Sequence, residues 1–196
     1  MMTEHTGIVA HFDRADIDTD QILPKQFLKR VERIGFGEFL FYDWRYDESG
    51  NKRKDFILNK KPYDSATVLL ARRNFGCGSS REHAVWALRD FGFRVIISPK
   101  FANIFYDNAF KNGLLLITLS EEITDMLFKN AYKSETVYQI TVDLKNQVII
   151  DSFGLTAQFE IDPFKKRCIM EGLDEIGLTL QFEDKIAEYE RRHKNL

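Results

Sequence analysis

The sequence has little cysteine: Cys77 and Cys168 are the only two among 196 residues. Two thiols cannot build a disulfide framework, and these two lack the repeated spacing of a zinc or iron–sulfur motif. Because a four-iron cluster normally takes several thiolates from its protein, we expect this chain to bind no cluster and no metal by itself. Both thiols are expected to be reduced.

The sequence also lacks a basic leader and a long apolar run. Residues Met1 to Gly7 do not show the basic segment and apolar stretch of a signal peptide. No run approaches the ~20 apolar residues that a transmembrane helix requires. These absences favour a cytoplasmic protein with no membrane partner.

The sequence also lacks a large excess of charge of one sign. The 28 basic and 30 acidic side chains give a formal net charge of -2, which argues against a broad surface for nucleic acid. With 44% hydrophobic and 30% charged residues, the composition is that of an ordinary globular protein. The length suits one full hydrophobic core, so we expect a single domain over residues 1–196.

The hydrophobic pattern predicts an α/β fold with a mixed sheet. Strands and helices alternate from residue 67 to residue 118, which implies parallel pairing, and three short β-rich runs in residues 137–161 suggest an antiparallel meander. The predicted strands before the meander are 7–12, 67–72, 94–98 and 114–118, and the predicted helices are 80–91, 102–111, a helix capped by Ser120, 163–171 and 184–192.

Two polar stretches interrupt this pattern. Residues 13–20 hold four aspartates whose spacing does not match a calcium loop, and we interpret them as a solvated turn. Residues 25–62 mix Phe with basic residues and glycine, and become dominated by charges and turn formers after residue 44. We expect this region to form a mobile substrate loop and a surface excursion, because such segments lack the burial that would order them.

Residues 74–84 carry the features of a small anion site. They join a predicted buried strand to a predicted helix, where free backbone N–H groups and the helix dipole favour negative charge. Two glycines allow the backbone to come close to a ligand, and Ser79, Ser80 and Arg81 offer two hydroxyls and a guanidinium suited to a carboxylate.

A purely structural interpretation of the same segment is a capped helix. The sequence Ser79-Ser80-Arg81-Glu82 fits the Ser-x-x-Glu capping box, which needs no function. Dinucleotide, P-loop and nucleophile-elbow motifs do not fit, because the glycines and lysine that each requires are missing. His83 is expected to be a structural histidine, and Cys77 a small buried filler with no base beside it.

Three stretches together resemble the aconitase C-terminal, or swivel, domain. They are residues 74–84 (Asn-Phe-Gly-Cys-Gly-Ser-Ser-Arg-Glu-His-Ala), 16–28 and 98–105. Within that family, Gly35-Phe36-Gly37, residues 41–45 and residues 172–180 are similar to the small subunits of bacterial isopropylmalate isomerases. Cys77 stands where aconitase proper has glutamate, which favours the isomerase branch.

The resemblance implies a swivelling β/β/α domain like the fourth domain of aconitase, in a heterodimer with a larger subunit. That subunit would carry a [4Fe–4S] cluster whose open iron acts as a Lewis acid on the departing hydroxyl. The implied reaction is a hydro-lyase isomerisation of 2-isopropylmalate to 3-isopropylmalate through isopropylmaleate, in leucine and branched-chain amino-acid biosynthesis.

The resemblance also implies roles for particular residues. Ser79 matches the catalytic base that removes a proton next to a substrate carboxylate, while Ser80 and Arg81 match substrate-binding residues. Asp20 matches an aspartate that supports a histidine of the cluster-bearing part, here on the partner chain. The segment after Pro24 corresponds to the substrate-selecting loop, so its basic residues are candidates for the second carboxylate: Lys29, Arg30 and Arg33.

Two alternatives stay open at this point. A homoaconitase or methylmalate (citraconate) isomerase small subunit differs only in substrate, because one methyl or methylene group changes discrimination by only about 1–3 kcal/mol. A non-catalytic module that binds a carboxylate at residues 74–84 belongs to a different class and would need no partner chain.

Overall fold

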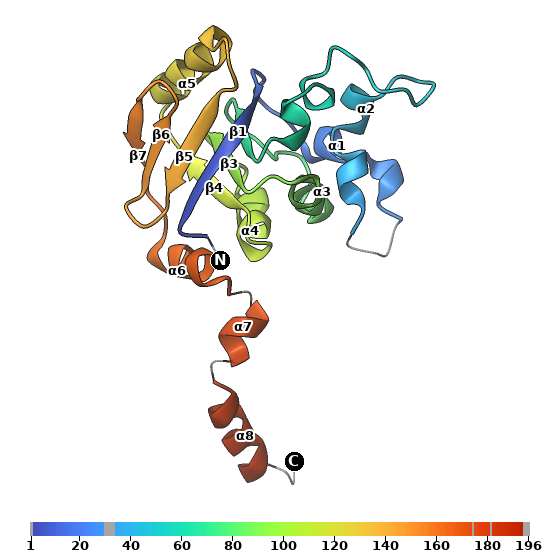
Figure 1. The fold of residues 1–196 in the computed structure, drawn as a ribbon. Helices are drawn as coiled ribbons and strands as arrows, with labels where there is room; N and C mark the ends of the chain where they lie inside the picture. Colours follow the sequence, from blue (N-terminus) through green and yellow to red (C-terminus); the bar gives the residue numbers. More distant parts are fainter. Residues whose placement is uncertain (1, 30–33, 174, 181, 194–196) are drawn as a thin grey trace.

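A computed structural model describes residues 2–29, 34–173, 175–180 and 182–193. In this part of the chain seven strands form one sheet in the order β4-β3-β2-β1-β5-β6-β7 (Figure 1). The strands are β1 (Glu4–Phe12), β2 (Val68–Ala71), β3 (Val95–Ser98), β4 (Leu115–Thr118), β5 (Gln139–Asp143), β6 (Val148–Asp151) and β7 (Thr156–Gln158).

Strand β1 is the seam between a parallel and an antiparallel half of the sheet. On one side Val9 pairs with Val68 of β2, in the parallel set that continues through β3 to β4. On the other side Thr6 pairs with Thr141 of β5, in the antiparallel set that continues through β6 to β7. The mixed sheet and the α/β class expected from the sequence are therefore confirmed.

Helices cover both faces of the sheet and give it two cores. The longer helices are α3 (His83–Phe91), α4 (Asn103–Lys111), α5 (Glu121–Lys133) and α6 (Pro163–Glu171). Along β2 the side chains alternate between the cores, because successive strand residues point to opposite faces. Leu69 lies in the core with α3 and α4, and Leu70 lies in the core with α5 and α6.

Most predicted elements form within one or two residues of their predicted bounds. Ser120 caps α5 by accepting a hydrogen bond from the N–H of Ile123, and Gly92 ends α3 as expected. The prediction of a helix from residue 80 is wrong, since α3 begins at His83. Among the described residues, no helix is both long enough and apolar enough to cross a membrane.

The segment before β2 folds into short turns of helix against the α3 face of the sheet. It contains α1 (Thr19–Ile22), α2 (Tyr42–Arg45) and the 3₁₀ turns η1 (Lys25–Phe27), η2 (Phe36–Phe39), η3 (Ile57–Asn59) and η4 (Tyr63–Ser65). Phe36, Phe41 and Leu58 are fully or almost fully buried in the core. These side chains anchor the region, and the mobility expected for residues 25–62 stays a prediction.

The interpretation of residues 13–20 as a solvated turn is confirmed for residues 13–16, which are exposed, and is wrong for residues 17–20, which are buried or half-buried and lead into α1. Ile17 and Thr19 are buried, and the stretch runs beside the loop that follows β2, with Asp18 and Cys77 forming a parallel bridge. Asp16 accepts a hydrogen bond from Asn74. The aspartates of this stretch therefore bind the neighbouring loop or cap α1, which fixes the two segments against each other.

The end of the described chain is an arm that leaves the domain. Gly172 ends α6 in the left-handed conformation with φ 70°, and α7 (Glu175–Leu180) and α8 (Glu183–Arg192) then extend away from the sheet (Figure 1). No residue of α8 is buried. The domain and the arm differ in this respect, because α3 to α6 each bury side chains in a core.

Candidate active site

The candidate site is the loop between β2 and α3, at the carboxyl ends of the parallel strands. Ligands commonly bind at this edge of open α/β sheets. Gly76 and Gly78 take positive φ angles of 78° and 95°. A Cβ at Gly76 would lie 2.2 Å from Cγ of Phe105, so only glycine fits beneath that ring. The backbone of the loop is thereby seated on α4.

Thr19 holds Ser79 through two contacts. The Oγ atoms of Thr19 and Ser79 are 2.8 Å apart, and the backbone N–H of Ser79 donates to Thr19 Oγ1 at 3.1 Å. The backbone N–H of Thr19 in turn donates to the carbonyl of Cys77 at 2.9 Å. Thr19 is 2% exposed, so its hydroxyl is fixed in place under the loop while Ser79 stays partly open to solvent.

Arg81 and Asp20 form an ion pair beside Ser79. Nη1 of Arg81 donates to Oδ1 of Asp20, and Nζ of Lys25 lies 3.4 Å from the other carboxylate oxygen. The hydrogen bond from Arg81 lowers the pKa of Asp20, and Lys25 adds to this effect. The carboxyl group is therefore ionised at neutral pH and engages both cations.

The capping box predicted at the start of α3 does not form. Glu82 is the N-cap residue and makes no side-chain cap, because Oε1 of Glu82 accepts from Nδ2 of Asn112 at 2.7 Å. The carbonyl of Ser80 accepts from Nδ2 of Asn108 at 3.1 Å, and Ser80 itself is exposed. Contacts with α1 and α4 thus hold residues 79–82 out of the helix, and the Ser79 hydroxyl is not used as a cap.

Of the predicted site residues that the structure describes, four are brought together. Ser79, Ser80, Arg81 and Asp20 lie in two adjoining segments. Lys29 is exposed in the turn after η1, and Arg30 and Arg33 lie outside the described residues. Thr19 was missed, since neither its residue type nor its spacing from Ser79 marks it as part of a site.

Neither cysteine is placed to bind a cluster or to act as a nucleophile. Cys77 is half-buried rather than the buried filler that we predicted, and burial together with Asp18 raises the pKa of its thiol. Cys168 is buried in α6. In the described part of the chain no group of three or more His, Cys, Asp or Glu side chains is arranged to hold a metal. The residues present do not fit an iron–sulfur cluster.

His83 packs as an aromatic side chain. Its ring lies 4.5 Å from the ring of Trp86 and 5.6 Å from that of Phe36, measured between centroids. Burial lowers the pKa of His83; the carboxylate of Glu82 opposes this effect and the guanidinium of Arg81 adds to it. A neutral ring between two aromatic neighbours agrees with the structural role expected for it.

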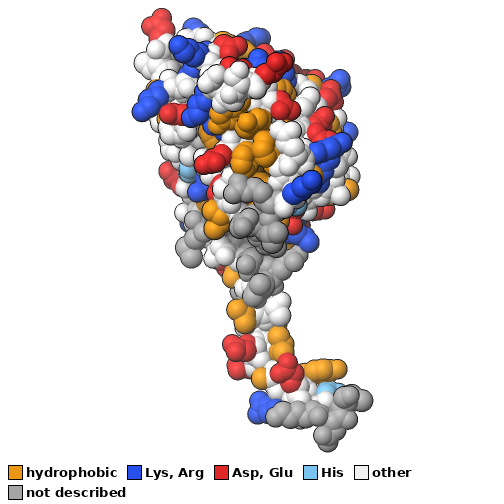
Figure 2. Space-filling model, turned by 90° about the vertical axis from the view of Figure 1, so that its right-hand side faces the viewer, with side chains coloured by type: hydrophobic (Ala, Val, Ile, Leu, Met, Phe, Trp, Pro, Cys, Tyr) orange, Lys and Arg blue, Asp and Glu red, His pale blue; other side chains and the backbone are white. Residues whose placement is uncertain are grey.

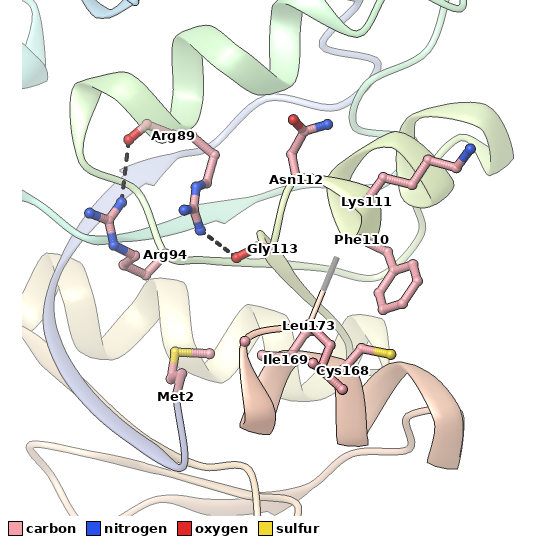
Figure 3. A pocket seen from close by; sticks show the side chains of 11 residues that line it. Met2, Arg89, Arg94, Phe110, Lys111, Asn112, Gly113, Cys168, Ile169 and Leu173 are labelled. Atoms are coloured by element: carbon pink, nitrogen blue, oxygen red, sulfur yellow. Dashed lines mark hydrogen bonds between the residues drawn. The ribbon is translucent and has the colours of Figure 1, made fainter. Parts of the chain in front are cut away.

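A cavity of about 370 Å³ lies beside Arg89, near the C-terminal end of α3 (Figure 3), whereas Ser79 precedes the N-terminal end of this helix. Arg89 and Arg94 line one side, and Met2, Ile169 and Leu173 line another. Both guanidinium groups donate hydrogen bonds to backbone carbonyls. Arg89 donates to the carbonyl of Gly113, and Arg94 donates to the carbonyls of Arg89 and Phe93. The two guanidinium groups are thus engaged by backbone carbonyls. The cavity is separate from the candidate active site.

Comparisons with known proteins identify the relatives of this chain. Residues 1–122 match the model of the aconitase C-terminal domain, residues 125–163 match the model LeuD_N, and residues 175–195 match the model of the C-terminal domain of 3-isopropylmalate dehydratase small subunits. The chain is 60% identical over 188 residues to the 3-isopropylmalate dehydratase small subunit of Brevibacillus brevis, covering 96% of each chain. It is 56% identical over 189 residues to the protein of the same name from Koribacter versatilis, again covering 96% of each.

A solved structure supports the fold independently. The 3-isopropylmalate dehydratase structure from Methanocaldococcus jannaschii superposes with a TM-score of 0.70 at 23% identity, covering 95% of this chain and 99% of that one. The identity to curated relatives over nearly the whole length, together with the match to the aconitase domain, settles the family. The chain belongs to the 3-isopropylmalate dehydratase small subunits of the aconitase superfamily.

Proposed function

We propose that this chain is the small subunit of a two-chain 3-isopropylmalate dehydratase, a hydro-lyase that isomerises 2-isopropylmalate to 3-isopropylmalate through isopropylmaleate on the route to leucine. The observation that carries the proposal is the placement of the Ser79 hydroxyl. It lies 2.8 Å from the buried Thr19 hydroxyl, on a glycine-rich loop next to Arg81. A lone exposed serine would have no comparable support.

In this proposal Ser79 takes the proton from the carbon next to a substrate carboxylate. A serine hydroxyl is a poor base at neutral pH, so it needs groups that favour its alkoxide. Thr19 Oγ1 already accepts the N–H of Ser79, and the same oxygen lies within hydrogen-bond distance of Ser79 Oγ. In its alkoxide form Ser79 can only accept, so Thr19 donates between the two oxygens, and that hydrogen bond stabilises the alkoxide.

Arg81 is proposed to bind the carboxylate next to the carbon that loses its proton. The electron pair left on that carbon spreads into this carboxylate, and a guanidinium fork stabilises the charge through paired hydrogen bonds. In the isolated chain Arg81 is engaged by Asp20. We expect the pair to exchange partners in the complex: Arg81 turns to the substrate, and Asp20 supports a histidine of the large subunit.

The remaining candidates bind substrate without taking part in proton transfer. Ser80 is exposed beside Ser79 and is proposed to hydrogen-bond a substrate carboxylate. The basic residues after Pro24 are proposed to bind the second carboxylate or to frame the isopropyl group. These are Lys29, Arg30 and Arg33.

The proposal requires a large subunit. The [4Fe–4S] cluster that the family resemblance implies is assigned to that subunit, because Cys77 and Cys168 lie in different elements of this chain and neither has cysteine neighbours. The half-open position of Ser79 agrees with a site completed by a second surface. We place the complex in the cytoplasm, where reduced thiols such as these two are normal.

The test is the dehydration of 3-isopropylmalate, followed by the ultraviolet absorbance of the unsaturated product. The assay is run with this chain alone, with an anaerobically reconstituted large subunit, and with Ser79→Ala in the same complex. Activity only in the complex, lost in Ser79→Ala while the subunits still associate, supports the proposal. Ser134→Ala is the matched control and should keep full activity, because Ser134 is half-buried like Ser79 but lies at the end of α5, where its hydroxyl donates to the carbonyl of Thr136.

Two outcomes would overturn the proposal. Activity of the isolated chain would exclude a shared site. An unaffected Ser79→Ala complex would remove the serine from the chemistry and favour a module that only binds carboxylates.

A further inference from the structure

Helix α8 carries an apolar stripe that stays largely exposed, and the printed ring contacts of the stripe come from α8 and its C-cap: Tyr189 stacks on His193, and Lys185 lies over Phe182. Phe182, Ile186 and Tyr189 are spaced four and three residues apart, which places them on one face of a helix. They are 53%, 38% and 64% exposed, respectively. Figure 2 shows hydrophobic side chains at the surface along this arm. Helix α8 is therefore amphipathic, as helices that pack against another surface commonly are.

The opposite face of α8 is polar. Asp184 and Arg191 lie on it, and Arg192 forms an ion pair with Glu188 one turn before. A helix of 10 residues has marginal stability in water on its own, and α8 buries no residue against this chain. Its amphipathic design is therefore explained by a surface outside the described part of the chain.

The family comparisons indicate whose surface this is. The domain body matches a model of the aconitase C-terminal domain over residues 1–122, whereas residues 175–195 match a separate model named for the small subunit. The arm thus belongs to the version of this domain that works as its own chain. A domain without a covalent link to its partner needs a non-covalent one, and an added amphipathic helix is a common form of such a link.

We propose that the apolar stripe of α8, made by Phe182, Ile186 and Tyr189, docks on the large subunit and tethers the small subunit to it. This inference rests on the proposed function for the identity of the partner. Figure 1 shows α8 at the far end of the arm, away from α1 and α3, which flank Ser79. The tether therefore contributes to association and leaves the proton-transfer groups untouched.

The experiment compares two double variants of the full chain. Ile186→Ser/Tyr189→Ser removes the stripe, and Asp184→Ser/Arg191→Ser places the same two serines on the opposite face of the same helix. Each is titrated into a fixed amount of reconstituted large subunit, with isothermal calorimetry for affinity and the dehydration assay for kcat at saturation. Sedimentation velocity of each small subunit alone gives its oligomeric state.

We expect the stripe variant to bind the large subunit about tenfold or more weakly, as loss of buried aromatic and aliphatic anchors does at interfaces. Its kcat at saturation should equal that of the parent chain, and the control variant should match the parent in both measurements. Equal affinity of the two variants would overturn the inference. So would a parent chain that dimerises alone through the stripe and binds the large subunit as tightly without it.

These outcomes are separate from failure of the proposed function. If the parent chain binds the large subunit but the complex shows no dehydration, the function fails and the affinity comparison still decides the tether. If the complex is active and the stripe variant binds normally, only the tether fails.

Discussion

Replacing Thr19 with valine tests how Ser79 is activated. Valine has nearly the shape of threonine and fits a position that is 2% exposed, but it cannot donate a hydrogen bond. The change removes the hydroxyl 2.8 Å from Ser79 Oγ and the acceptor for the N–H of Ser79. Thr19→Ser keeps both contacts and loses only a methyl group.

The expected size follows from the kind of hydrogen bond that is lost. A hydrogen bond to a charged group contributes about 1.5–3 kcal/mol, so losing the donor to a serine alkoxide should reduce kcat by about ten- to a hundredfold. The same loss raises the pKa of the serine by about one to two pH units. Because the active form is the deprotonated one, the acidic limb of the kcat profile should move to higher pH by that amount.

The assay is the pH dependence of kcat for the reconstituted complex with the parent chain, Thr19→Val and Thr19→Ser. We expect KM to change little and Thr19→Ser to restore both the rate and the pH profile. The reasoning is refuted if Thr19→Val keeps the parental profile, or if valine and serine lower kcat equally at every pH. A purely structural role for Thr19 would lower stability in urea without moving the pH limb.

Three further predictions concern stability and reactivity. Tyr138→Phe removes a buried hydroxyl that donates to Asp151 at 2.9 Å, and should lower the free energy of unfolding in urea by about 1–3 kcal/mol; a neutral result would mean that the contact is not made. The pKa of Asp13 is lowered chiefly by the hydrogen bond from Arg72, so this pair stabilises the fold above the unfolded-state pKa of about 3.9 and loses its effect as the pH falls further. Because the Asp13 side chain is 40% exposed, Asp13→Asn should cost less than ~1 kcal/mol at pH 7, and this cost should shrink as the pH falls through the lowered pKa of Asp13, as measured by urea unfolding at pH 7 and at successively lower pH; a cost that does not fall with pH would contradict this. Burial raises the pKa of the Cys77 thiol, so the folded chain should react with iodoacetamide at pH 7 more slowly than the urea-unfolded chain, and equal rates would contradict this.

Much of the fold could be predicted because its signals are local. The β2 residues from Val68 to Ala71 are all buried, and a short apolar run between turn residues indicates such a strand. Ser120 and Gly92 mark helix ends through backbone chemistry that depends on a few neighbouring residues. Helix α1 was missed because its four residues show no apolar period.

The two sequences with capping-box spacing show that neighbouring residues alone do not decide whether a capping box forms. The sequence Asp18-Thr19-Asp20-Gln21 forms a complete capping box in α1, with both reciprocal hydrogen bonds present. The sequence from Ser79 to Glu82 has the same spacing and forms none, because Thr19 holds Ser79 and Asn112 holds Glu82. Contacts across about 60 and 30 residues of sequence decide between the two outcomes, and a single sequence does not display them.

The same limit applies to the site. The motif marked Ser79 and Arg81 through their neighbours in sequence, whereas Thr19 became visible only when residues 13–20 were found beside the loop after β2. That arrangement is made by backbone hydrogen bonds between the two segments and by the contact of Asn74 with Asp16, whereas the Asp18 side chain caps α1.

The position of β1 at the seam of the sheet bears on how the chain folds during synthesis. Its first partner, β2, follows after about 60 residues, but its second partner, β5, begins only at Gln139. At about 5–20 residues per second, the ribosome needs roughly 7–26 s to pass from the end of β1 to the end of β5. Throughout that interval one edge of β1 is unpaired, and unpaired strand edges recruit other chains. A nascent chain therefore completes its sheet only after β5 has emerged, and until then the open edge of β1 is a position at which another chain can pair.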